Sequence, residues 1–164
     1  MTKLIPAALV VFLLAGCGGD DKEKSASPAP TAAPEAISTD LKTEPSIPKP
    51  SGAPPATLVK KDIVKGKGPK AQAGDLVSVQ YTGVSFSTGE KFDASWDRGG
   101  EPFQFPVGGG QVIAGWDKGI PGMRVGGRRE LIIPPDQAYG PQGSPPAIGP
   151  NETLIFVVDL EKIG

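Results

Sequence analysis

Apolar and polar residues alternate along several short stretches in the last two thirds of the chain. From Asp75 to Gly83 the even and odd positions separate into one apolar face, which includes Val77, Val79 and Tyr81, and one polar face. This period of two is typical of a strand with one buried face in an antiparallel sheet. The same alternation predicts strands at 103–107, 129–133 and 154–160, and an irregular apolar run predicts another at 58–64.

One helical stripe lies between these strands. Its apolar residues recur at intervals of three and four: Val112, Ile113, Trp116 and Ile120. Pro121 and Gly122 end the helix, because proline lacks the backbone N–H and glycine favours a left-handed cap. A helix of about two turns is marginal alone in water. We therefore expect an α+β fold for residues 56–164, with a curved antiparallel β-sheet wrapped around one short α-helix.

The N-terminal sixteen residues have the proportions of a secretory signal peptide. Lys3 precedes an apolar run from Leu4 to Leu14, which is shorter than the roughly 20 residues of a membrane-spanning helix. The run ends in Leu14-Ala15-Gly16-Cys17, which resembles the lipobox of bacterial lipoproteins. That resemblance implies cleavage after residue 16 and acylation of Cys17. Because Cys17 is the only cysteine, the alternatives are a free thiol or an intermolecular bridge.

Residues 17–55 are rich in proline, alanine and charged residues and almost lack large apolar side chains. Such a segment buries too little surface to offset its ordering entropy. We predict a disordered tether that follows the lipidated cysteine and acts as a spacer, with a proline-rich docking site as the alternative.

Composition excludes several kinds of chemistry. The net charge of −1 gives no reason to expect nucleic acid binding. The chain has no histidine, and no phosphate loop, dinucleotide fingerprint or nucleophile elbow occurs in it. We expect no metal and no cofactor, and a reaction, if there is one, that needs little proton transfer.

Five motifs occur in a fixed order: Tyr81-Thr82-Gly83, Lys91-Phe92-Asp93, Val112-Ile113-Ala114-Gly115-Trp116, Ala138-Tyr139-Gly140 and Leu154-Ile155-Phe156. Each aromatic residue taken alone is better explained by core packing. Together, in residue identity and spacing, the motifs resemble those of the FKBP-type peptidyl-prolyl isomerases over residues 58–163. The resemblance implies an apolar cavity above Trp116, an acid at its rim in Asp93, and an ion partner for that acid in Arg98.

The resemblance also implies a set of site residues. The expected catalytic residues are Tyr81, Phe92, Asp93 and Tyr139. The expected substrate-binding residues are Arg98, Phe103, Val112, Ile113, Trp116, Ile148 and Phe156. Two positions depart from the family pattern, since Ser144 stands where many members carry histidine and Ala147 replaces a larger aliphatic residue. We expect these to change substrate preference and to weaken macrolide binding.

The resulting hypothesis is a prolyl isomerase, lipid-anchored to a bacterial membrane through Cys17, that assists folding on the extracytoplasmic side. Its expected partners are proline-containing polypeptides and macrolide immunophilin ligands. Two other classes remain open at this point. One is a noncatalytic chaperone that grips proline-containing segments in the same cavity, and the other is an adhesin or structural lipoprotein of the envelope.

Overall fold

The structure, a computed structural model, describes residues 36–164. The predicted signal peptide, the predicted lipobox with Cys17 and the first part of the predicted tether therefore lie outside the described residues. The strands are β1 (Val59–Val64), β2 (Leu76–Ser85), β3 (Lys91–Ala94), β4 (Phe103–Pro106), β5 (Gly127–Ile133) and β6 (Leu154–Ile163). The helix α1 (Ala114–Gly119) lies between β4 and β5 in the chain.

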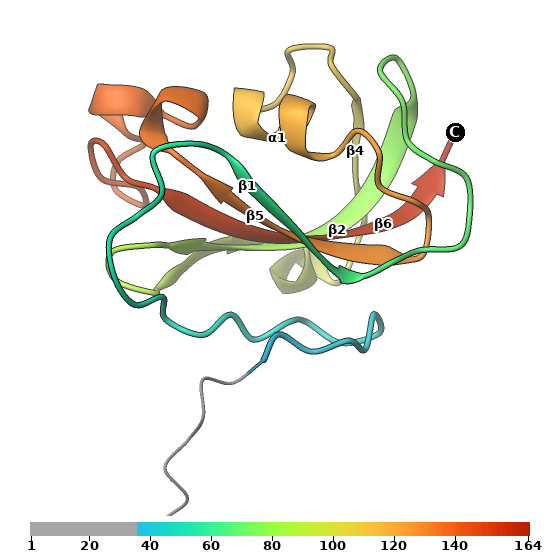
Figure 1. Cartoon of the computed structure of the whole chain (residues 1–164), viewed down its shortest axis with the longest axis horizontal. Coiled ribbons are helices and arrows are strands. Elements are labelled where there is room, and N and C mark those ends of the chain that lie inside the picture. Colours follow the sequence, from blue (N-terminus) through green and yellow to red (C-terminus); the bar gives the residue numbers. More distant parts are fainter. Residues whose placement is uncertain (1–35) are drawn as a thin grey trace, which may run out of the picture. The chain divides into compact units, whose positions relative to one another are not determined.

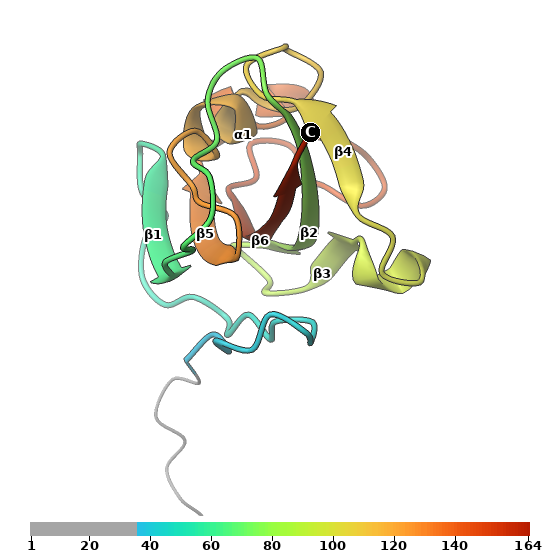
Figure 2. The ribbon, with the colours of Figure 1, turned by 90° about the vertical axis from the view of Figure 1, so that its right-hand side faces the viewer.

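All six strands form one antiparallel sheet in the order β1-β5-β6-β2-β3, with β4 also paired to β2. The first half of β2 pairs with β4 and its second half with β3, so this long strand serves two branches of the sheet. The sheet curls around α1, as Figures 1 and 2 show. The predicted α+β architecture and its five strand positions are confirmed.

The helix packs so closely on the sheet that glycine is needed at the contact. A Cβ atom at Gly115 would lie 2.4 Å from Cγ2 of Ile133, and one at Gly119 would lie 2.7 Å from Cδ2 of Leu131. Trp116 and Ile120 then enter a core that also contains residues from β2, β4, β5 and β6. Burial of this apolar stripe stabilises a helix of only six residues.

Some short elements were not expected from the pattern. β3 has four residues, too few to show an alternation, and it pairs with β2 from Thr82 to Val84. Three single turns of 3-10 helix occur at Trp96–Arg98, Pro135–Gln137 and Gly140–Gln142. Within residues 36–164, no helix is both long and apolar enough to cross a bilayer.

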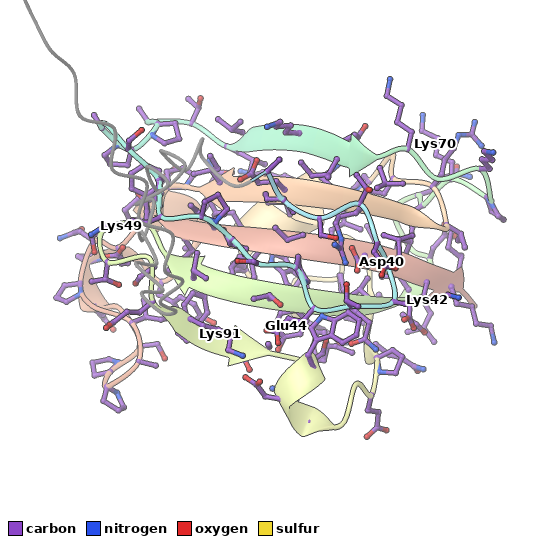
Figure 3. All side chains as sticks on the ribbon, turned by 90° about the horizontal axis from the view of Figure 1, so that it is seen from below. Asp40, Lys42, Glu44, Lys49, Lys70 and Lys91 are labelled. Atoms are coloured by element: carbon purple, nitrogen blue, oxygen red, sulfur yellow. The ribbon has the colours of Figure 1, made fainter. Side chains whose placement is uncertain are left out.

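Residues 36–55, which we call the N-terminal strap, differ from the expected disordered tether. The strap runs along the face of the sheet opposite α1 (Figures 1 and 3). Pro45 is buried, and Ile47 packs on a second apolar cluster formed by Val84, Phe86 and Ile155. A few well-placed apolar residues thus dock a segment whose mean composition is that of a linker.

A buried ion pair makes a second set of contacts with the strap. Arg128 is fully buried and donates from Nε to Asp159 at 2.6 Å. Its Nη1 donates to the carbonyl oxygen of Ser38 at 2.7 Å, and its Nη2 to that of Thr43 at 3.1 Å. A buried guanidinium needs acceptors for its N–H groups, and the strap provides two of them. The ordered contacts therefore begin near residue 38, earlier than the domain boundary at 56 expected from composition.

Candidate functional site

An open cavity of about 510 Å³ lies between the start of α1, the strands β2, β3 and β6, and the loop after β5. It is lined by Tyr81, Phe92, Asp93, Phe103, Gly110, Gln111, Val112, Ile113, Trp116, Tyr139 and Phe156. Nine of these residues belong to the set expected from the sequence. The fold thus collects side chains that are up to 75 positions apart, from Tyr81 to Phe156, around one hollow.

Aromatic rings in edge-to-face contact form the floor of the cavity. The Trp116 ring centroid lies 5.1 Å from that of Tyr81, at an interplanar angle of 81°. It lies 5.2 Å from that of Phe156, at 86°. Perpendicular pairs at these separations match the electrostatics of the ring faces and edges. Since Trp116 is only 4% exposed, the floor is a fixed apolar surface.

Gly83 leaves room for the two rings that form one wall of the cavity, those of Phe92 and Phe156. A Cβ atom at this position would lie 2.7 Å from Cζ of Phe92 and 2.8 Å from Cε1 of Phe156. These two rings pack edge to face with centroids 5.4 Å apart. Any side chain at residue 83 would displace one of them. The glycine of the first motif therefore has a steric role in the shape of the cavity.

One polar cluster stands at the rim. The Tyr81 hydroxyl donates to Oδ2 of Asp93 at 2.5 Å and accepts from Nη2 of Arg98 at 2.7 Å. The same guanidinium pairs with Oδ1 of Asp93 at 2.6 Å. Burial, followed by the hydrogen bond to Asp93, raises the pKa of Tyr81 to about 12. Tyr81 therefore stays protonated, and both carboxylate oxygens of Asp93 are already engaged.

The opposite rim offers backbone groups. The N–H of Ile113 and the C=O of Val112 make no backbone hydrogen bond within residues 36–164, whereas the C=O of Ile113 accepts from Trp116 N at 2.9 Å. Tyr139 is 41% exposed. An extended peptide could pair with the backbone groups here while its side chains enter the cavity.

Gly110 and Gln111 line the cavity but were not expected to. Asp117, on α1, accepts from the N–H groups of Gly108 at 2.8 Å and Gly110 at 3.0 Å, and so fixes the loop that carries them. The signal available in the sequence was an aspartate in the first turn of the helix, shortly after a run of glycines.

Two of the expected substrate-binding residues are not among those that line the cavity. Ile148 is 4% exposed and packs in the main core, at the base of a loop closed by two hydrogen bonds between Ser144 and Ile148. Arg98 pairs with Asp93, as the resemblance implied, and also donates to the Tyr81 hydroxyl, so it lies at the rim of the cavity. Ser144 and Ala147 are exposed in the same loop as Ile148.

The chemistry that this arrangement permits is limited. Across residues 36–164, no group of three or more histidine, cysteine, aspartate or glutamate side chains is placed to hold a metal ion. The cavity contains no nucleophile beside a base, and its one acid is held in the rim cluster. What it can do is take an apolar segment out of water and present a few polar groups to it.

Comparison with known proteins agrees with this geometry. Residues 68–161 match the family model described as "FKBP-type peptidyl-prolyl cis-trans isomerase". The chain is 62% identical to the "FK506-binding protein" of Streptomyces anulatus over 121 residues, which are 73% of this chain and 97% of that protein. It is 53% identical over 117 residues to the "Probable FK506-binding protein" of Corynebacterium glutamicum, covering 71% and 96% of the two chains.

Among solved structures, the crystal structure of AtFKBP13 superposes with a TM-score of 0.62 and 38% sequence identity, covering 68% of this chain and 96% of that one. The match spans nearly the whole of each of these relatives. Together with the matched family model and the aromatic cavity, these similarities lead to one conclusion: the chain belongs to the FKBP-type peptidyl-prolyl cis-trans isomerases.

Proposed function

We propose that the cavity above Trp116 is where this isomerase rotates Xaa-Pro bonds, and that its substrates are proteins folding outside the cytoplasm. The observation that carries the first part is an open, ring-lined hollow of about 510 Å³ whose one acid, Asp93, is paired with Arg98. It is wide enough for a proline ring and its neighbours.

The physical reason is the polarity of the amide bond. Rotation faces a barrier of about 18 to 20 kcal/mol because resonance must be broken. The planar, resonant amide is more polar than the twisted one, so an apolar environment raises the planar ground state more than the transition state. A reduction of about 5 kcal/mol corresponds to roughly five thousandfold in rate. No proton has to move, which suits a cavity without a free acid or base.

The residues divide into three roles in this proposal. Trp116, Phe156 and Phe92 hold the proline ring in an apolar environment. The Ile113 N–H and the Val112 carbonyl orient the peptide backbone, and the exposed Tyr139 hydroxyl donates to a substrate carbonyl. Asp93, fixed by Arg98 and Tyr81, places the one fixed negative charge of the rim beside the amide as it twists.

The cellular setting rests on the N-terminal sequence. The apolar run and the Leu14-Ala15-Gly16-Cys17 motif support export and acylation of Cys17. With the anchor in the membrane, residues 18–35 and the strap connect it to the folded domain. The substrates would then be polypeptides that fold near the outer surface of that membrane.

The assay should use residues 36–164, because a fragment from residue 56 lacks the strap. We expect acceleration of a prolyl-peptide isomerisation over the spontaneous rate, and a loss of at least tenfold for Phe92→Ala and for Asp93→Ala. Leu76→Ala is the control, since Leu76 is 47% exposed and does not line the cavity. No acceleration, or equal rates for all variants, would refute this use of the cavity. Suppression of aggregation without isomerase activity would favour a noncatalytic chaperone.

Ligands of the FK506 type provide a second test of the same cavity. Two relatives carry that ligand in their names, and the ring-lined hollow here supports binding of such a macrolide. Because Ser144 and Ala147 are the two departures from the family pattern and both are exposed, we expect weaker binding than in a Ser144→His/Ala147→Ile variant. Competition between FK506 and a prolyl peptide would measure both affinities.

A further inference from the structure

Cations gather at one edge of the sheet. Of the ten lysines in residues 36–164, five lie between positions 60 and 70: Lys60, Lys61, Lys65, Lys67 and Lys70. The one acid in this stretch, Asp62, is paired with Arg129 at 2.6 Å. Within the described part of the chain, none of the five lysines forms an ion pair. We call these five lysines, together with Arg124, the basic edge.

Protection of an edge strand explains only part of this pattern. Lys60 and Lys61 lie on β1, at the end of the sheet order, where lysines discourage pairing with a second chain. Lys65, Lys67 and Lys70 come after β1 has ended, so they protect no strand.

This loop is held firmly against the turn before β5. The N–H of Gly68 donates to the C=O of Val125 at 3.0 Å, and the N–H of Val125 donates to the C=O of Pro69 at 3.0 Å. Nη1 of Arg124 donates to the C=O of Gly68 at 3.1 Å. The backbone that carries the cations is thus already ordered, which lowers the entropy cost of binding an anion.

A cleft of about 220 Å³ opens between the two segments. It is lined by Asp62, Val64, Lys65, Gly66, Gly122, Met123, Arg124, Gly127 and Arg129. Lys65 and Arg124 make the cleft positive, because the charge of Asp62 is matched by that of Arg129.

Arg129 contributes a further donor to the cleft. Its side chain is only 10% exposed, and its Nε and Nη1 bind Asp62 and the carbonyl oxygen of Gly119. Its Nη2 has no hydrogen-bond partner within residues 36–164, and it is not sealed from solvent. A guanidinium group fixed in this way suits phosphate oxygens.

We propose that this cleft and the basic edge bind the phosphate groups of anionic lipid headgroups. The inference rests on the proposed anchor, which keeps the domain within reach of a membrane surface. Clusters of four to eight basic residues beside a membrane attract anionic lipids, with each residue contributing about fivefold in affinity. Nucleic acid fits less well, because no aromatic side chain lines the cleft for bases to stack on.

The test uses residues 36–164 without the anchor, so that only the folded domain contributes. Binding is measured to vesicles of phosphatidylglycerol and phosphatidylcholine in equal amounts, and to vesicles of phosphatidylcholine alone. We expect salt-sensitive binding to the first and none to the second. Lys65→Gln/Lys67→Gln should weaken it by about 25-fold. Lys42→Gln/Lys49→Gln, which removes the same charge from the strap (Figure 3), should change it less than twofold.

Several outcomes would overturn the proposal. These are equal binding to both kinds of vesicle, equal losses in both double variants, tighter binding to single-stranded RNA than to anionic vesicles, and saturation by inorganic phosphate without vesicle binding. The prolyl-peptide assay on the same variants separates this result from the proposed function. A wild-type domain that binds vesicles but accelerates no isomerisation would leave the lipid site standing and refute the catalytic role.

Discussion

Tyr81 joins the floor of the cavity to its rim. Its ring packs against Trp116, while its hydroxyl is shared between Asp93 and Arg98. Removal of that hydroxyl leaves the ring in place but takes a partner from each of the two charged groups. Tyr81 therefore tests whether the rim cluster has an energetic role distinct from ring packing.

We predict that Tyr81→Phe changes the dependence of stability on pH. Unfolded tyrosine ionises near pH 10, whereas Tyr81 in the folded protein ionises near pH 12. Between these values the unfolded state loses its proton first, so the stability contributed by Tyr81 is full below pH 10 and is lost as the pH rises to 12. The difference in unfolding free energy between wild type and Tyr81→Phe should shrink from pH 9 to pH 12 in urea titrations. A constant difference would contradict the raised pKa.

A second prediction concerns Gly83. Gly83→Ala would place a methyl group within 2.8 Å of the rings of Phe92 and Phe156, which must then move. We expect a cost of about 1 to 3 kcal/mol in stability and a loss of isomerase activity larger than that destabilisation explains at 25 °C. Gly149→Ala is the matched control, since nothing lies within 4 Å of its added Cβ. Equal activity of the two variants would show that the wall tolerates displacement.

At the scale of elements, the strap is the part of the fold that could not be predicted from composition. The strap contacts Arg128 through the carbonyl groups of Ser38 and Thr43. In addition, its Glu44 accepts from Nζ of Lys91 at 3.0 Å and from the Thr82 hydroxyl at 3.2 Å. Lys91 directly precedes Phe92 and Asp93 on β3. The strap thus supports, from the opposite face of the sheet, the strand that carries one wall of the cavity.

We predict that residues 36–164 unfold at a markedly higher temperature than residues 56–164. Loss of the strap leaves Arg128 without two acceptors and exposes the cluster around Ile155, which together should cost about 2 to 4 kcal/mol. Such a loss lowers Tm by roughly 10 °C in a domain of this size. Within the longer fragment, Ile47→Ala should lose part of this stability, whereas Thr39→Ala, at an exposed position, should lose little. Identical Tm values for the two fragments would show that the strap contributes nothing.

The elements that could be predicted from sequence are those long enough to show a regular spacing of apolar residues. β2 and β6 are long enough to alternate over several residues, and the stripe ending at Ile120 has helical spacing. β3 and the strap could not be found in this way. The first has four residues, and the second is held by carbonyl groups and a few apolar side chains whose partners are distant in sequence.

The site residues likewise divide into those that could be predicted from sequence and those that could not. Nine lining residues followed from the family resemblance, and eight of them lie within its five motifs; Phe103 lies outside the motifs. Gly110 and Gln111 did not, because their place depends on the backbone hydrogen bonds to Asp117. Ile148 was expected among the substrate-binding residues, yet it packs in the main core, in a loop closed by two hydrogen bonds to Ser144.

At the scale of the whole molecule, charge is unevenly distributed although the total is nearly zero. The net charge of the chain is −1, and five lysines with one acid fall in positions 60–70. A domain of this kind can orient itself on a charged surface without being attracted to it strongly as a whole. The proposed anchor and the proposed lipid site at the basic edge would then have separate functions, one holding the protein at the membrane and the other setting which side faces it.

The last prediction separates these two functions by their energies. An acyl chain contributes about 0.8 kcal/mol per buried methylene group, so two or three chains on Cys17 far exceed the roughly 1 kcal/mol that each lysine adds near an anionic surface. The full chain, expressed in cells that process lipoproteins, should incorporate labelled fatty acid and stay with the membrane in 1 M salt. Cys17→Ser should abolish the label, whereas Lys65→Gln/Lys67→Gln should keep both label and membrane association. Label retained by the Cys17→Ser chain would disprove acylation at this residue. Release of the wild-type chain by salt alone would show that charge, and not lipid, holds it at the membrane.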